Sequence, residues 1–166
     1  MNEVLIEFKD VIDEEIQAYE TLGNLYNVKQ SLLVQGKSDE LWDVDAKIVE
    51  SADYIKSLNS KRKIVAGYLG DENLTMSEII EKAKAENDVI YEKLQQQQVK
   101  LKILAKSLNL QEKTNMTLIQ HGLTMVGKTL DIIVSALMPQ AQGQYDKAGH
   151  SVQSDKSLIS SIVEEA

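Results

Sequence analysis

The chain has 166 residues, a formal net charge of −8 and no cysteine. This length fits about one domain, and the lack of cysteine excludes disulfide bonds and thiolate metal sites. The acidic excess argues against nucleic-acid binding, which requires a basic face. A single proline, with many Leu, Ile, Lys, Glu and Gln residues, predicts an all-α protein.

The most apolar region of the chain is not expected to insert into a membrane. Residues 116–138 contain His121, Lys128 and Asp131, which are unfavourable inside a bilayer. The first residues also lack the basic and apolar stretches of a signal peptide.

The first predicted helix covers residues 2–35. Its apolar side chains recur every seven residues, as in Leu5, Ile12 and Tyr19, with a second apolar series beside them. This wide apolar face suits two neighbouring helices. Gly36 is expected to end the helix because glycine readily adopts the left-handed conformation of a C-cap.

The second predicted helix covers residues 39–69, with Ser38 as its N-cap and Gly70 at its end. Arg62 interrupts its apolar series. The stem of this side chain could lie along the seam with its charge at the edge. Alternatively, Arg62 could pair with an acidic residue of the first helix.

The third predicted helix is the longest and covers residues 74–137 if it is continuous. Thr75 and Glu78 form a capping box at its start, and Leu74 with Ile79 forms a hydrophobic staple. About 60 residues of helix would span roughly 90 Å, because each residue adds about 1.5 Å. Polar residues interrupt its apolar seam, and such positions specify a particular partner or register. They are Gln97, Gln111 and Asn115.

Short connections make consecutive helices antiparallel, so the three helices predict an antiparallel hairpin plus one long helix in a three-helix bundle or coiled coil. The third helix is longer than its two partners. It could project beyond them, or break near Asn109 and fold back as a fourth helix. The absence of glycine and proline there favours projection. Residues 1–138 form this predicted bundle.

Residues 139–166 are predicted to be a flexible tail. After Pro139 the sequence is rich in small and polar residues, which is typical of a linker. A short amphipathic helix follows, and it would be stable only when docked in a groove. Its apolar face consists of Leu158, Ile159, Ile162 and Val163.

Residues 122–129 match the phosphate-loop pattern G-x-x-x-x-G-K-[ST]. That loop must join a buried strand to a helix, and the chain contains no strand-like stretch. The glycines are therefore interpreted as helical. His121 and His150 lie far apart and outside any metal-binding spacing. We expect neither catalysis nor a cofactor nor a bound metal.

The order of features along the chain resembles that of the FlgN family, the bacterial flagellar export chaperones for hook-associated proteins. The features are the helical pair joined at residues 32–41, Ser60-Lys61-Arg62, the capping-box segment 74–80, the long helix with Leu108-Asn109 and Leu118-Ile119, and the tail motif 145–149. The resemblance covers nearly the whole chain. It implies a cytoplasmic chaperone, with no enzymatic activity, that serves type III secretion.

The resemblance also implies partners and binding residues. The clients would be the two hook–filament junction proteins, bound through their C-terminal helical segments and kept from assembling before export. The expected client-binding residues are Leu118, Ile119, Leu123, Ile132, Ile133, Leu158, Ile159, Ile162 and Val163. The segment from Tyr145 to Gly149 would contact the export gate. The alternative is a homo-oligomeric coiled-coil scaffold or another secretion chaperone.

Overall fold

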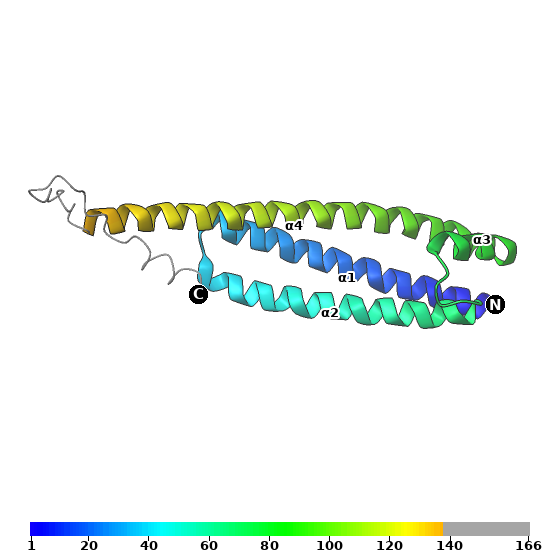
Figure 1. Cartoon of the computed structure of the whole chain (residues 1–166). Coiled ribbons are helices and arrows are strands. Elements are labelled where there is room, and N and C mark those ends of the chain that lie inside the picture. Colours follow the sequence, from blue (N-terminus) through cyan, green and yellow to red (C-terminus); the bar gives the residue numbers. More distant parts are fainter. Residues whose placement is uncertain (138–166) are drawn as a thin grey trace, which may run out of the picture. The chain divides into compact units, whose positions relative to one another are not determined.

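The computed structural model describes residues 1–137 and confirms the all-α class. These residues form four helices and no strand: α1 (Asn2–Gln35), α2 (Ser38–Tyr68), α3 (Met76–Glu86) and α4 (Asp88–Leu137) (Figure 1). The chain divides into two compact units, Met1–Gly122 and Leu123–Ala166. The predicted tail lies outside the described residues, and the boundary near residue 138 stays a prediction.

The end of α1 is where the sequence predicts it. Gly36 takes a left-handed conformation with φ 69°. The N–H of Gly36 donates to the Leu33 carbonyl, and the N–H of Lys37 donates to the Leu32 carbonyl. These two bonds form a Schellman motif, which satisfies the last carbonyl groups of the helix.

The predicted start of α2 is wrong by one residue. Ser38 is already helical, and Lys37 occupies the N-cap position without a side-chain hydrogen bond. The reason is the Schellman motif at the end of α1. It includes Lys37, and α2 begins at the next residue. The ion pairs Lys29–Asp45 and Lys61–Glu14 then join the two helices in antiparallel order.

The prediction of one unbroken helix from residue 74 is also wrong. The capping box of Thr75 and Glu78 is present, but it begins the short helix α3. At Asn87 the backbone is extended, with φ −161°. The Asn87 Oδ1 atom accepts hydrogen bonds from the N–H groups of Val89 and Ile90, at 3.0 and 3.2 Å. Asn87 therefore caps α4, which continues unbroken past Asn109.

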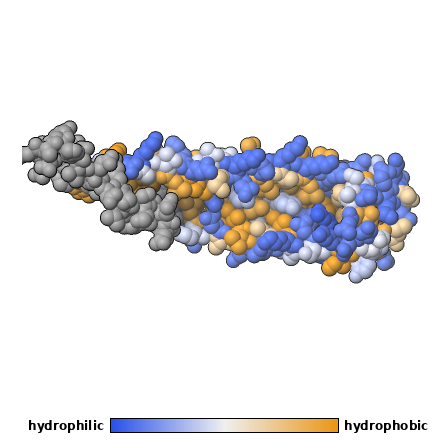
Figure 2. Space-filling view, in the orientation of Figure 1, coloured by the Kyte–Doolittle hydropathy of each residue, from blue (hydrophilic) through white to orange (hydrophobic). Residues whose placement is uncertain are grey.

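The apolar residues of Met1–Gly122 form two core clusters. The first core cluster lies near the N-terminal half of α1 and also draws on α2, α3 and α4; Leu5, Phe8, Ile79 and Leu94 are among its fully buried members. The second core cluster joins Ala18, Leu22, Ile55, Leu58 and Leu108. Figure 2 shows apolar side chains gathered along the middle of one face, bordered by hydrophilic residues.

A partly buried ion pair lies between α1 and α2. Arg62 Nη1 donates to Glu15 Oε2 at 2.9 Å, and the Glu15 side chain is fully buried. The second interpretation of Arg62, pairing with an acidic residue of the first helix, is therefore the correct one. Glu15 Oε1 has no hydrogen-bond partner among the described residues. Burial raises the pKa of the Glu15 carboxyl, and the nearby Arg62 charge only partly opposes this.

Removing the Asn87 cap should destabilise the fold. Asn87→Ala deletes the acceptor of two backbone N–H groups, so we expect a loss of about 1 kcal/mol in the free energy of unfolding. Urea denaturation followed by circular dichroism measures this loss. The control is Asn109→Ala, at an exposed position inside α4. Equal stability of the two variants would contradict the capping role.

Glu15→Gln should change how stability depends on pH. A raised pKa in the folded state means that ionised Glu15 opposes folding. The usual pKa of a glutamate side chain is 4.5, and the pKa of folded Glu15 is higher. The wild type should therefore lose stability relative to the variant between these two pH values, as the pH rises. Denaturation of both proteins over a pH series tests this. Glu14→Gln, at the neighbouring and more exposed carboxylate, is the control. A pH-independent difference for Glu15→Gln would refute the assignment.

Candidate functional site

Carboxamide side chains of α4 hold it against α1. Gln97 Nε2 donates to the Lys9 carbonyl at 3.0 Å and to Asp13 Oδ1 at 2.7 Å. Fourteen residues later the same pattern recurs, since Gln111 Nε2 donates to Asn27 Oδ1 at 2.7 Å.

Asn115 completes this set of bonds by donating from Nδ2 to the Tyr26 carbonyl at 3.0 Å. The bonds from Gln97 span either 88 or 84 residues of sequence, and Gln111 bonds to Asn27 across 84 residues. A constant offset of this kind means that α1 and α4 run parallel. The polar seam positions identified in the sequence therefore fix one register between the two helices.

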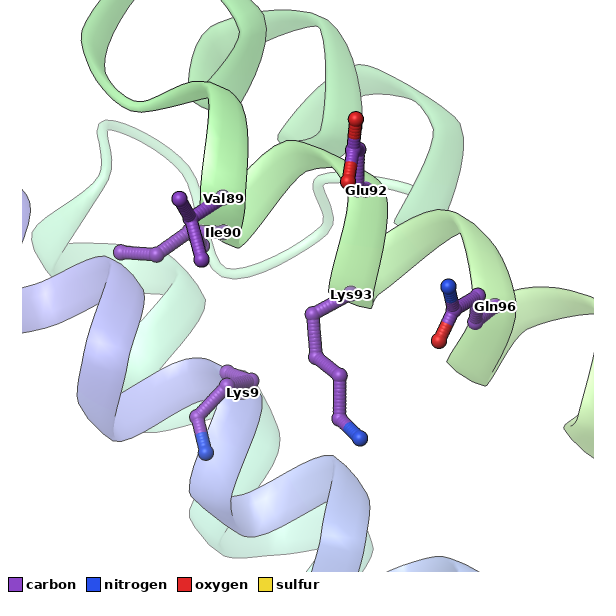
Figure 3. A pocket seen from close by; sticks show the side chains of 6 residues that line it. All are labelled: Lys9, Val89, Ile90, Glu92, Lys93 and Gln96. Carbon is purple, nitrogen blue, oxygen red and sulfur yellow. The ribbon is translucent and has the colours of Figure 1, made fainter.

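The hollow where α4 begins offers no catalytic arrangement. It measures about 460 Å³ and is lined by Lys9 of α1 and by residues at the start of α4, including Glu92 and Lys93 (Figure 3). Lys9 is paired with Asp10 and Asp13. The hydrogen bond to Asp10 raises the pKa of the Lys9 amine, whereas a nucleophilic lysine needs a lowered pKa.

The last part of α4 differs from the part that packs on α1. Each residue from 123 to 137 is exposed, although most of these side chains are apolar. The register gives a reason, because α1 ends at Gln35 and an offset of 88 residues reaches only position 123. α1 contains no residues that could pair with later positions of α4.

The exposed apolar residues of this segment form a heptad stripe. Its members are spaced alternately by three and four residues, which places them on one face of the helix. They are Leu123, Val126, Leu130, Ile133 and Leu137. We call them the α4 stripe; the exposed fractions of Leu123 and Leu130 are 68% and 55%.

A second, smaller apolar ridge lies beside the α4 stripe. It consists of Met125, Ile132 and Ala136, all exposed. Polar residues occupy the remaining face, including Lys128, Asp131 and Ser135. An exposed apolar surface on a helix is typical of a site that binds another protein.

The phosphate-loop pattern lies inside this helix. Residues 122–129 continue α4 without interruption, so they do not form the loop that cradles phosphates. No atom lies within 4 Å of where a Cβ would stand at Gly122 or Gly127. Close approach of another helix of this chain therefore does not explain the two glycines within the described residues.

The structure separates the predicted client-binding residues into three groups. Leu118 and Ile119 are half-buried, whereas Leu123, Ile132 and Ile133 are exposed. Leu158, Ile159, Ile162 and Val163 lie outside the described residues, as do Tyr145 and Gly149, the residues predicted to contact the export gate. Of the exposed residues, Leu123 and Ile133 belong to the α4 stripe and Ile132 to the smaller ridge. The α4 stripe also contains Val126, Leu130 and Leu137, which the sequence-based prediction did not include, although their spacing of three and four residues is visible in the sequence.

Residues 1–137 contain neither a metal-binding cluster nor a membrane-spanning helix. No three His, Asp or Glu side chains in this range group closely enough to hold a metal ion. None of the helices in this range combines the length and hydrophobicity of a membrane span.

The fold and the α4 stripe together define an all-helical bundle protein with an uncovered, heptad-patterned helix. The sequence model of the FlgN protein family matches residues 1–153. The chain therefore belongs to the FlgN family, whose members are flagellar export chaperones. No curated protein and no solved structure matches it.

Proposed function

We propose that this protein is a cytoplasmic chaperone without enzymatic activity that binds the C-terminal helical regions of hook-associated proteins. It keeps these clients from assembling before export and delivers them to the export gate. The observation that carries the proposal is the α4 stripe, an exposed heptad face on a member of an export-chaperone family.

The physical argument is complementarity between two amphipathic helices. A helix that mediates assembly has an apolar face, and an uncovered heptad stripe can cover that face. Burying one Leu, Ile or Val contributes about 2 kcal/mol, so five residues contribute roughly 10 kcal/mol before the costs of association. The net charge of −8 supports solubility while the stripe is uncovered.

Client binding is also assigned to Leu118, Ile119 and Ile132, and to Leu158, Ile159, Ile162 and Val163 of the C-terminal region. The segment from Tyr145 to Gly149 is assigned to the export gate. These assignments follow from the family resemblance.

One observation favours a second candidate, a homo-oligomeric scaffold. In the α4 stripe, Leu occupies the a positions, and Val126 and Ile133 occupy the d positions. Leucine at a with isoleucine at d favours assemblies of more than two helices, and copies of this chain could supply them. Light scattering at micromolar concentration separates the candidates, because a monomer argues against the scaffold.

Charged substitutions in the α4 stripe should strongly weaken client binding. Leu130→Asp and Ile133→Asp each place a carboxylate in the proposed interface, and each should weaken binding by at least about 30-fold, as loss of a central anchor does. Pull-down and titration with the C-terminal region of a hook-associated protein measure this. Ser135→Asp, on the polar face of the same turns, is the matched control and should bind normally. Full binding by both stripe variants would refute the proposal.

Removal of residues 140–166 should weaken client binding, because the proposed contacts of Leu158 and Ile162 are then lost. The full-length variant carrying Leu158→Asp and Ile162→Asp should show the same loss without shortening the chain. Titration against the same client region measures both. If both proteins bind as tightly as the wild type, the C-terminal region has no part in client binding.

A further inference from the structure

A second exposed apolar surface lies on the outer face of α2. Trp42, the only tryptophan of the chain, is 79% exposed, and Val49 is 60% exposed. Ala46, also exposed, lies between them, so the three residues follow the i, i+4, i+7 spacing of one helical face. The opposite face carries Val44 and Ile55, which are buried in the bundle. Trp42 therefore has no packing role in the described bundle.

Acidic residues surround this tryptophan. Between Ser38 and Asp53, α2 carries one basic residue, Lys47, against an acidic set of Asp39, Glu40, Asp43, Asp45, Glu50 and Asp53. Three of the acidic residues are paired, with Lys37, Lys29 and Lys56. Asp39, Asp43 and Glu50 form no ion pair among the described residues. We call Trp42, Ala46 and Val49, with these three carboxylates, the Trp42 surface.

We propose that the Trp42 surface binds a basic amphipathic helical segment of another protein, at a site distinct from the α4 stripe. Tryptophan is one of the side chains enriched at the energetic centres of protein interfaces. The unpaired carboxylates attract Lys and Arg side chains and repel acidic partners, which determines the kind of segment that fits. The same charges disfavour an anionic membrane surface.

The other end of α2 provides an internal comparison. Ile64 is 61% exposed, but its neighbours are Lys61, Arg62 and Lys63. Lys61 and Arg62 are paired with Glu14 and Glu15, and Lys63, which forms no ion pair within residues 1–137, should repel a basic segment there. Binding of a basic segment should therefore be confined to the acidic half of the helix.

The test uses the full-length protein and two synthetic helical peptides of about 18 residues, or five turns. One carries Leu on one face and Lys elsewhere, and in the second each Lys is replaced by Glu. Because Trp42 is the only tryptophan, its fluorescence emission reports contact directly. We expect the Lys peptide to shift this emission to shorter wavelength and the Glu peptide to leave it unchanged.

Variants establish where the peptide binds, with anisotropy of a labelled Lys peptide as the readout. Trp42→Ala should weaken binding by about 30-fold, and the triple variant Asp39→Asn, Asp43→Asn, Glu50→Gln should weaken it and reduce its salt dependence. The charge-matched control Glu72→Gln, Glu81→Gln, Glu86→Gln and the variant Ile64→Ala should bind as the wild type does.

Several results would overturn the assignment. An unchanged Trp42 emission, or an equal loss in the charge-matched control, would mean that net charge alone attracts the peptide. Loss of peptide binding in Leu130→Asp would place the peptide on the α4 stripe. Self-association of the wild type that Trp42→Ala abolishes would make a second copy the occupant.

Discussion

The parallel register between α1 and α4 is the constraint on which the rest of the structure depends. Hydrogen bonds from Gln97 and Gln111 repeat after fourteen residues and allow one alignment of the two helices. The alignment brings Leu94 and Leu108 into the two core clusters. Because α1 ends at Gln35, the alignment also determines which residues of α4 can pack against α1. A heptad pattern alone would permit several alignments, each shifted by seven residues.

The two ends of α4 consequently differ in exposure although both carry apolar residues at heptad spacing. Up to Asn115 its seam serves the fold, and the polar members of that seam bond to α1. From Leu123 onward the same kind of apolar spacing is exposed. The chain belongs to the FlgN family, and this exposed face is its proposed client-binding surface. The acidic surface around Trp42 lies on a different helix and has a different chemistry.

Local chemistry made parts of this fold predictable from sequence. The left-handed Gly36 and the reciprocal bonds of Thr75 and Glu78 depend on a few adjacent residues, so their positions were predicted correctly. The helix break at Asn87 was not predicted. An asparagine ends a helix only when its side chain accepts hydrogen bonds from the N–H groups that follow it. The partner of Arg62 depended on how two helices align. Trp42 is exposed because the opposite face of α2 packs into the core. The sequence alone did not show which face that is.

The buried amides between α1 and α4 also determine which movements are costly. The oxygen atoms of Gln97, Gln111 and Asn115 are buried without a donor among the described residues, so each amide is only half satisfied. If α4 slid along α1 by one turn, the amide nitrogens would lose their acceptors while still shielded from solvent. If α4 separated from α1, water would hydrate both halves of each amide. For these three amides, slippage is therefore more costly than exposure to water.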